Sequence, residues 1–409
     1  MPASLRRFLG ALAGNRRAAT LCAIAYLAFF SVYLSERPVY DWDVLAYMAV
    51  ALRIEGVPAA RIHDKTYDLL RSSIPHAWVD NLSGNFNPEA IAVDPSPQWM
   101  GDIGLRQDWA AHSDSFAAQL PFFSVKPLYP ALMALGNSIG LSLIESGLII
   151  SAISYFLIGV IFYAWFLERM PPFVALGAMA LLILNPWLVP LARVIGPDIL
   201  SIAFVLGGAY FAIKGRPVTS AIIFVLSITA RPENVLYAGI FLCYLGIVQS
   251  LSLLWTGVFL VLALAVYKGI STIGNNYGWK TLFYYVFVNR SARPGVAAPP
   301  IGIHSLLAAY LGRLDRIIFG GGESPVFALV GFGVLCLKLG VDSLTESIKD
   351  KYTQLVLVAT VAAIARMILL PTEAYRGLLP SYMLVTVAFL NVCASACTQL
   401  RAAKRAVPP

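Results

Sequence analysis

Long apolar runs constrain the fold of this chain more than any other feature. A helix needs about 20 apolar residues to cross a membrane. Ten segments are candidates, at about 18–34, 143–167, 172–190, 198–213, 217–230, 234–250, 252–270, 324–340, 353–370 and 379–397. Hydrophobic residues make up 58% of the chain and charged residues only 13%, whereas soluble domains carry about 25% charged residues. The sequence therefore predicts an all-α polytopic membrane protein.

The distribution of positive charge predicts the orientation of these helices. Four arginines precede the first apolar run, namely Arg6, Arg7, Arg16 and Arg17. By the positive-inside rule, they place the N-terminus in the cytoplasm. No small-residue cleavage site follows, so we expect a retained helix and no removed signal peptide. The segment 127–140 is short and bounded by proline and glycine, so we expect it to lie in the membrane interface. The basic residues of the later short loops and of the tail then fall inside.

This topology gives a single transmembrane domain over residues 1–409 with two long extracytoplasmic loops, at about 35–142 and 271–322. The net charge of +8 then reflects orientation and lipid head groups and does not indicate nucleic-acid binding. The five cysteines fall in apolar stretches and predict no disulfide framework. The alanine- and arginine-rich termini favour a bacterial inner (plasma) membrane.

An acidic motif, Tyr40-Asp41-Trp42-Asp43, follows the first apolar run. Carboxylates at a bilayer surface are costly unless they are solvated, paired or functional. Asp43 and Tyr47 are spaced to share a helical face, so we expect a helix to begin near Asp43. Three interpretations of the motif stand: a solvated helix cap, a general base that takes a proton from a hydroxyl, and a divalent-cation site. We expect the base, and no cofactor.

Three arginines lie at or near the extracytoplasmic ends of the predicted helices. Arg231 lies in the turn Thr-Ala-Arg-Pro-Glu-Asn, Arg376 precedes the last span, and Arg366 lies about one turn inside the same face. A guanidinium holds a phosphate through two parallel hydrogen bonds and keeps its charge. The alternative is that Arg231 and Arg376 snorkel to the interface or pair with the neighbouring Glu233 and Glu373.

The second long loop is basic, against the positive-inside rule, with Lys268, Lys280, Arg290, Arg293, Arg313 and Arg316. Long loops cross membranes regardless of charge, which is one explanation. The other is a site for an anionic lipid phosphate, with interleaved aromatic residues along the acyl chain. The histidines show no metal-ligand spacing, and His63 beside Asp64 is a candidate for acceptor binding. The sequence has no hydrolase, zinc-peptidase or ATPase motif.

The order of these features resembles the integral-membrane glycosyltransferases of the GT-C fold, the mannosyltransferase and aminoarabinose-transferase-like superfamily. YDWDVLAY is similar to the family's acidic motif after the first helix, and KPLYPALMALG to its interfacial segment. RVIGPDILS, TARPEN and YRGLLPSYMLV resemble its later outer turns and its final arginine. The matches run through most of the chain. The motif here is Asp-x-Asp where the family has Asp-Glu, so either acid can match the catalytic one, and Tyr47 favours Asp43.

The resemblance implies a GT-C-like bundle of about ten transmembrane helices with interfacial helices in the first outer loop. It also implies inverting transfer of a sugar from a polyprenyl-phosphate donor to a hydroxyl of a glycan, lipid or protein acceptor, with Asp43 or Asp41 as the base. The donor phosphate would be bound by Arg376, Arg231, Lys280, Arg366 and Arg290. The donor and acceptor sugars would be bound by Asp198, Tyr47, Tyr129, Lys126 and His63.

A different function is also compatible with outer arginines and long loops, namely a lipid-linked oligosaccharide transporter, flippase or polymerase. A transporter needs ionisable residues in the middle of its spans. The interiors of the predicted helices are nearly free of them, which favours the enzyme.

Overall fold

The computed structural model describes residues 15–85, 103–248, 251–289, 300–319, 330–331, 333, 350–370 and 375–406. Side chains are described in these ranges except at 313–319, 375 and 398–406. Every regular element in these ranges is a helix, and the β pairing there consists of a single bridge between Val39 and Val194. The predicted all-α fold is confirmed for this part of the chain.

Five of the described helices are long and apolar enough to cross a membrane, as the predicted membrane character requires. They are α2 (Arg16–Ser35), α11 (Leu143–Phe166), α17 (Leu253–Ile273), α22 (Lys351–Leu369) and α23 (Tyr375–Ala406). Four shorter apolar helices occupy further predicted spans, namely α12 (Pro172–Ile183), α14 (Asp198–Ile213), α15 (Pro217–Ala230) and α16 (Val235–Val248). Helices therefore lie where nine of the ten spans were predicted, and five of those helices have full spanning length.

Two predicted spans need comment. The segment 172–190 is not one helix, because α12 ends at Ile183 and a short α13 (Leu188–Arg193) follows. Pro186 has no N–H to continue the helical ladder, and the Asn185 side chain accepts from the N–H of Trp187 (2.9 Å) in a local turn. The predicted span 324–340 lies almost wholly outside the described residues.

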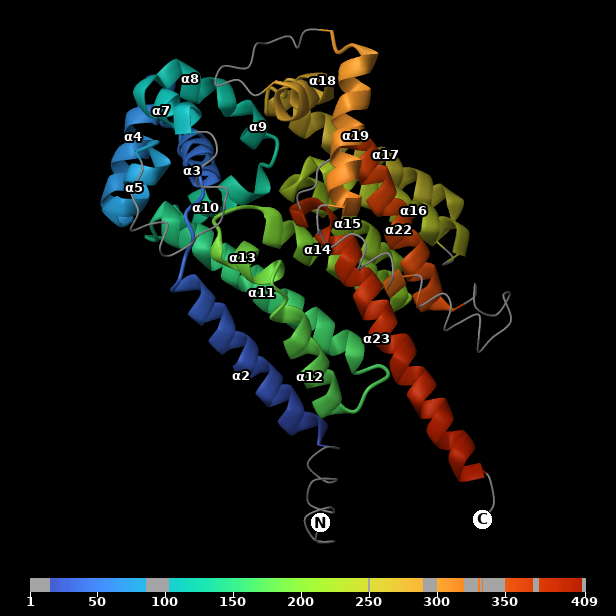
Figure 1. Ribbon diagram of the computed structural model, residues 1–409. Coiled ribbons are helices and arrows are strands. Elements are labelled where there is room, and N and C mark those ends of the chain that lie inside the picture. The colour runs from blue at the N-terminus through green and yellow to red at the C-terminus, as the bar shows by residue number, and fades with distance from the viewer. Residues whose placement is uncertain are drawn as a thin grey trace.

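The described part of the first long loop forms seven short helices that gather at one end of the long helices (Figure 1). They are α3 (Asp43–Ile54), α4 (Ala59–Ser73), α5 (His76–Leu82), α7 (Ile103–Ala111), α8 (Ser113–Gln119), α9 (Pro121–Ser124) and α10 (Leu128–Ser138). The residues of α3 from Val44 to Leu52 are all buried, because α4, α9 and α10 pack around them. The 11 residues of α10 reach about 16 Å, roughly half the hydrocarbon core, so this segment is too short for a span, as expected.

The described part of the second long loop is hydrogen-bonded to the C-terminal end of α22. It contains α18 (Trp279–Phe283), a π-helical turn η3 (Tyr284–Val288) and α19 (Ile303–Phe319). The Trp279 indole donates to the Leu369 carbonyl (2.7 Å), and the Tyr310 hydroxyl donates to the Ile368 carbonyl. These bonds place α18 and α19 beside the end of α22 that contains Arg366.

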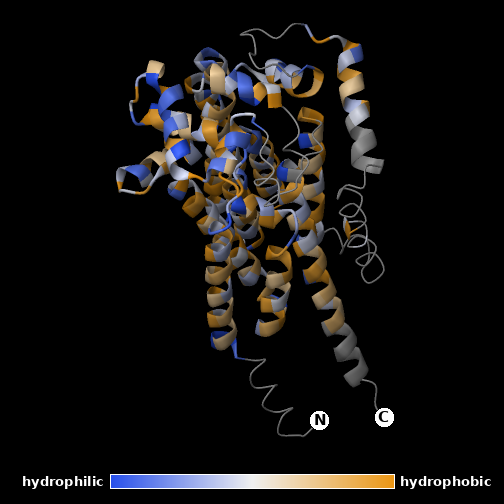
Figure 2. Cartoon of the chain, turned by 60° about the vertical axis from the view of Figure 1, so that its left-hand side comes forward, coloured by the Kyte–Doolittle hydropathy of each residue, from blue (hydrophilic) through white to orange (hydrophobic). Residues whose placement is uncertain are grey.

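The two ends of the bundle differ in composition. We call the end with the first-loop helices the loop end; α2 begins and α23 ends at the opposite, terminal end (Figure 1). Apolar residues predominate along the long helices, and hydrophilic residues gather at the loop end (Figure 2). Large apolar side chains such as Leu181, Leu253 and Val261 are exposed on these helices. An apolar outer surface is what contact with lipid requires.

An ionic group at the terminal end, the terminal clamp, consists of Glu168, Arg169, Lys214, Asp350 and Lys351. The Glu168 carboxylate lies 3.0 Å from the Lys214 ammonium and 2.9 Å from the Lys351 ammonium. The Arg169 guanidinium lies 3.7 Å from Asp350, whose carboxylate caps α22 by accepting from two backbone N–H groups. The clamp joins the ends of α11 and α14 to the start of α22.

Candidate active site

The start of α3 is held beside the start of α14, although the two are far apart in the sequence. The Val39 N–H donates to the Arg193 carbonyl (3.0 Å), and the Arg193 guanidinium donates to a carbonyl two residues before Val39 (2.7 Å). The acidic motif follows Val39 directly, and α14 begins at Asp198. This pairing brings Asp43 and Asp198, the first residues of α3 and α14, to the same place.

Arg376, from the first turn of α23, lies among three carboxylates. Its guanidinium nitrogens are 3.3 Å from Asp41 Oδ2, 3.7 Å from Asp43 Oδ2 and 3.6 Å from Asp198 Oδ2. The side chain of Arg376 is 22% exposed, and those of the three acids are 9–20% exposed. A nearly buried guanidinium thus faces more negative charge than it can neutralise.

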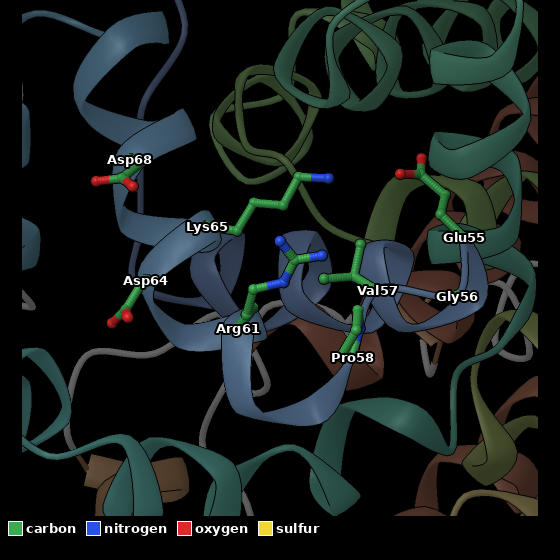
Figure 3. Close-up of a pocket in the computed structure, with 8 residues that line it drawn as sticks. All are labelled: Glu55, Gly56, Val57, Pro58, Arg61, Asp64, Lys65 and Asp68. Atoms are coloured by element: carbon green, nitrogen blue, oxygen red, sulfur yellow. The ribbon is translucent and has the colours of Figure 1, made fainter.

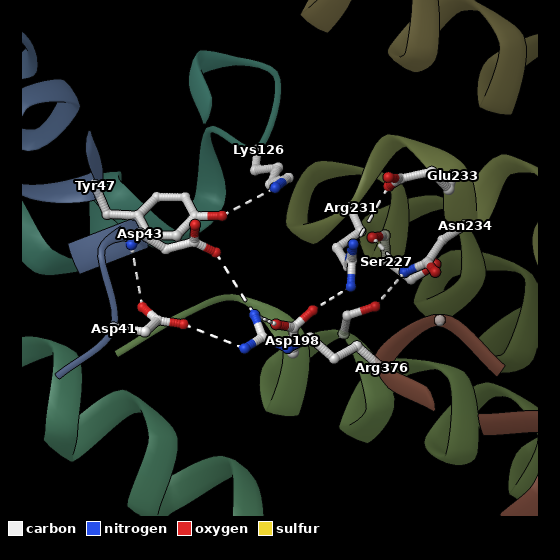
Figure 4. Close-up of polar contacts among 12 residues, drawn as sticks. Asp41, Asp43, Tyr47, Lys126, Asp198, Ser227, Arg231, Glu233, Asn234 and Arg376 are labelled. Carbon is white, nitrogen blue, oxygen red and sulfur yellow. Dashed lines mark hydrogen bonds and ion pairs between the residues drawn. The ribbon is translucent and has the colours of Figure 1, made fainter. Parts of the chain in front are cut away.

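Arg231 extends this group on the far side of Asp198 (Figure 4). Its guanidinium contacts the Asp198 carboxylate directly and lies 3.6 Å from Glu233 Oε2. The turn that presents Arg231 is fixed by Asn234, whose amide donates to the Ser201 hydroxyl (2.8 Å) and to a carbonyl at the end of α15 (2.9 Å). We call these six residues the carboxylate–arginine cluster: Asp41, Asp43, Asp198, Glu233, Arg231 and Arg376.

The two acids of the motif have different environments. Both oxygens of Asp41 are engaged, since Oδ1 accepts from the Asp43 N–H (3.1 Å) and Oδ2 from Arg376. The Asp43 carboxylate makes the 3.7 Å ion pair with Arg376 and, among the described residues, has no hydrogen-bond donor. Asp41 therefore holds α3 and Arg376 together, and the lone pairs of Asp43 stay available.

The pKa of Asp41 is raised to about 7, because burial disfavours its charged form and Asp43 and Asp198 add repulsion that Arg376 only partly offsets. A carboxyl group that titrates near neutrality in such a group is a marker of a functional site. The protonation of Asp41 therefore changes the charge around Arg376 in the physiological pH range.

Lys126 and Tyr47 form the wall of the cluster nearest the first-loop helices. The Lys126 ammonium donates to the Tyr47 hydroxyl (3.0 Å), and Tyr47 packs edge-on against Tyr129, whose hydroxyl donates to the Gly147 carbonyl (3.1 Å). Burial and the nearby Arg231 lower the pKa of Lys126. Three of the predicted sugar-binding residues, Tyr47, Lys126 and Tyr129, thus lie in one row of contacts, with Tyr47 in the middle.

Arg366 lies behind the cluster, buried at 4% exposure. It is close enough to Glu233 and Arg231 to interact with both charges. Its guanidinium packs on Gly377 at the start of α23, where an added Cβ would lie only 2.3 Å from two guanidinium nitrogens. Its Nε has no hydrogen-bond partner among the described residues. Gly377 is thus the residue that leaves space for a buried cation next to Arg376.

Three predicted site residues belong neither to the carboxylate–arginine cluster nor to the side chains described around it. His63 lies on α4, where its ring nitrogens contact Asp64 (2.9 Å) and the Trp109 carbonyl (3.0 Å), so it packs within the first-loop helices. Lys280 is exposed on α18, with no ion pair in the described part of the chain. Arg290 lies outside the described residues.

Sequence reasoning missed Glu233 and Gly377 as parts of the site. From the sequence, Glu233 was considered only as a partner that could neutralise Arg231. The turn TARPEN, in which Glu233 follows a proline, already placed both residues at one helix end. Nothing local marks Gly377, because its role depends on a side chain from another helix.

With Lys126 and Arg366 included, four carboxylates face four cations, so the group is close to neutral when all are ionised. In the described residues no set of three histidine, cysteine or acidic side chains has the geometry of a metal site. Chemically, the arrangement offers a hydrogen-bond-free carboxylate beside guanidinium groups that can bind an anion. No protein-family model, curated protein or solved structure matches this chain.

Proposed function

We propose that this chain is a GT-C type integral-membrane glycosyltransferase. It moves a sugar from a polyprenyl-phosphate donor to an acceptor hydroxyl, with inversion, at the extracytoplasmic face of a bacterial plasma membrane. One observation carries the proposal: Arg376 lies within 3.3–3.7 Å of both acids of the motif, although Asp41 is 335 residues away in the sequence. A proton acceptor and a phosphate-binding group are therefore side by side.

Asp43 is the proposed base. Its carboxylate accepts no hydrogen bond from the described residues, whereas Asp41 is bound by a backbone N–H and by Arg376. Asp43 takes the proton of the acceptor hydroxyl as the acceptor oxygen bonds to the anomeric carbon. The bond from that carbon to the phosphate oxygen breaks in the same displacement, and the oxygen keeps the electron pair.

The leaving polyprenyl phosphate gains negative charge that needs fixed cations in a site of low polarity. Arg376 and Arg231 are the proposed ligands, because both are partly exposed at the cluster. Both are paired with carboxylates here, so the phosphate competes with Asp198 for them. Arg366 is buried behind them and adds positive potential without being a direct ligand.

The sugars are proposed to contact Tyr47, Lys126 and Asp198, which border the acid and the two arginines. The donor sugar arrives already attached to lipid, so no nucleotide site is needed. Lys280 and Arg290 remain candidates for contacts with the donor lipid. The described part of the second loop is hydrogen-bonded to the end of α22 that contains Arg366, next to the cluster.

The proposal is tested in membranes that contain the overexpressed chain and a labelled polyprenyl-phosphate sugar. Asp43→Asn removes the proposed base and should lower the rate of transfer by about 10³-fold or more. The protein level should be unchanged. Glu36→Gln, which removes an exposed carboxylate near the same motif, is the matched control and should keep full activity. Wild-type transfer by both Asp43→Asn and Asp41→Asn would reject the function proposed here.

A further inference from the structure

A cavity of about 460 Å³ lies where α3 turns into α4, at the end of α3 away from Asp43. This volume is within the roughly 300–1,000 Å³ range of small-ligand sites. Arg61 and Lys65, one turn apart on α4, line it together with Asp64 and Asp68, whose carboxylates lie on the other side of α4 from Glu55 (Figure 3). Glu55 lies on the opposite side.

The charges of this cavity are distributed unevenly. The two aspartates each have a neighbour on α4, since Asp64 contacts the His63 ring (2.9 Å) and Asp68 pairs with Arg71 (3.0 Å), and both carboxylates are exposed. Arg61 and Lys65 make no ion pair within the described residues. The start of α4 also has no capping side chain and no acid in its first turn, so its dipole adds to the positive potential. One wall therefore attracts anions, and Glu55 opposite attracts cations.

The cavity is linked through α10 to the start of α11, a helix long enough to cross a membrane. Glu55 accepts a hydrogen bond from the Asn137 amide of α10 (2.9 Å), and Asn137 precedes the start of α11 at Leu143 by six residues. If α11 crosses a membrane, as its length and composition allow, the bilayer surface would lie near its first turn.

Exposed apolar side chains lie close in sequence to the hydrogen-bonded pair Glu55 and Asn137. Ile54, Leu135 and Ile139 are 50%, 60% and 74% exposed. In the sequence they flank Glu55 and Asn137, and they continue toward the exposed Ile149 and Ile153 of α11. A charged cavity beside such residues matches the boundary between lipid head groups and acyl chains.

We propose that this cavity binds the head group of a phospholipid with a phosphate and a primary ammonium, as in phosphatidylethanolamine. Arg61 and Lys65 bind the phosphate, and Glu55 accepts hydrogen bonds from the ammonium. The acyl chains lie along Ile54, Leu135 and Ile139. The inference stands independently of the glycosyltransferase proposal, because no residue of the carboxylate–arginine cluster takes part.

Native mass spectrometry of the purified chain, titrated with lipids of identical acyl chains, tests the inference. Phosphatidylethanolamine should bind about fivefold more tightly than phosphatidylcholine, whose quaternary ammonium cannot donate hydrogen bonds to Glu55. The double variant Arg61→Gln, Lys65→Gln should lower the affinity for phosphatidylethanolamine about fivefold. Glu55→Gln should remove the preference over phosphatidylcholine but leave the binding of phosphatidylglycerol no weaker.

The matched control is Arg17→Gln with Arg216→Gln, which removes the same charge at exposed positions at the terminal end of the bundle. It should bind as the wild type does. Equal affinity of the wild type and the Arg61, Lys65 variant, or an equal loss in the control, would overturn the inference. Free glycerophosphoethanolamine that binds as tightly as the lipid would also overturn it, since the site would then serve a soluble phosphate.

Discussion

The two ionic groups at the ends of this molecule use the same residue types in opposite proportions. In the terminal clamp, one carboxylate, Glu168, is shared by two lysines at 3.0 and 2.9 Å. At the loop end, one guanidinium, Arg376, is shared by three carboxylates at 3.3–3.7 Å. The clamp lysines are 33–35% exposed, whereas Arg376 and its partners are at most 22% exposed.

The difference separates a structural ion pair from a candidate reaction site. In the terminal clamp, the cations outnumber the carboxylates, but the lysines reach water, which screens their mutual repulsion. Their extra charge therefore lowers the stability of the fold only slightly. Three carboxylates around one nearly buried guanidinium repel one another even though the whole group is close to neutral, and such local conflict persists where function requires it. The clamp should therefore affect stability, and the cluster should affect activity.

After the loss of the proposed base, the largest expected effect is at Arg376. Arg376→Ala leaves Asp41, Asp43 and Asp198 without their shared cation, and it removes a proposed phosphate ligand. We expect transfer to fall by about 10²–10³-fold, measured as sugar released from the labelled donor. Arg376→Lys keeps the charge without the two-pronged geometry and should recover only part of the rate. Arg216→Ala, an exposed arginine at the terminal end, is the control, and an equal loss there would remove the contrast.

The second effect is at Gly377. An alanine Cβ would lie 2.3 Å from the Arg366 guanidinium, so the buried cation must shift or the start of α23 must move. Overpacking of this kind costs about 1–3 kcal/mol, and we expect lower thermal stability together with reduced transfer. Gly239→Ala on α16, whose Cβ would meet nothing within 4 Å, should be neutral. A Gly377→Ala variant that matches wild type in both measurements would show that Arg366 has no fixed position.

The third effect is a pH dependence from Asp41. Because its pKa is raised from 3.8 to about 7, the carboxylate that binds Arg376 is lost as pH falls below about 7. Transfer should then decrease, by about tenfold per pH unit if the charge is essential. Stability should change in the opposite sense, since a raised carboxyl pKa favours the folded state at low pH and loses that contribution as pH rises toward 7.

Asp41→Asn is the matched variant for this effect and should flatten both profiles between pH 5 and 8. Initial rates and unfolding midpoints across that range provide the measurement. Unchanged profiles in the variant would assign the titration to another group.

The smallest effect is at the terminal clamp. Glu168→Gln removes the charge that pairs with Lys214 and Lys351, and we expect a loss of about 1 kcal/mol, because the lysines are partly exposed. Transfer measured below the unfolding temperature should be unchanged. A loss of activity larger than the loss of stability would mean that the two ends are coupled.

Much of the fold could be predicted from the sequence because it depends on local properties. Helices occur where apolar runs were predicted, and segment 127–140 is the short helix α10. The error at 172–190 comes from Pro186, whose effect on a helix is local but was outweighed by the apolar run. At the site, the predicted bases Asp41 and Asp43, the predicted sugar ligand Asp198 and the predicted phosphate ligands Arg231 and Arg376 lie together. Their roles stay predictions. The role of His63 was a guess from one adjacent acid, and its ring packs elsewhere.

The sequence by itself determined that the described part of this chain is helical, with helices long and apolar enough to cross a membrane and with acids and arginines at helix ends, because hydropathy and spacing act within one segment. Only the tertiary structure decided which charge meets which. Three carboxylates share Arg376, two lysines share Glu168, and Gly377 leaves room for Arg366. Those contacts join residues up to 335 positions apart, so helix packing sets their distances and burial, and no local pattern encodes them.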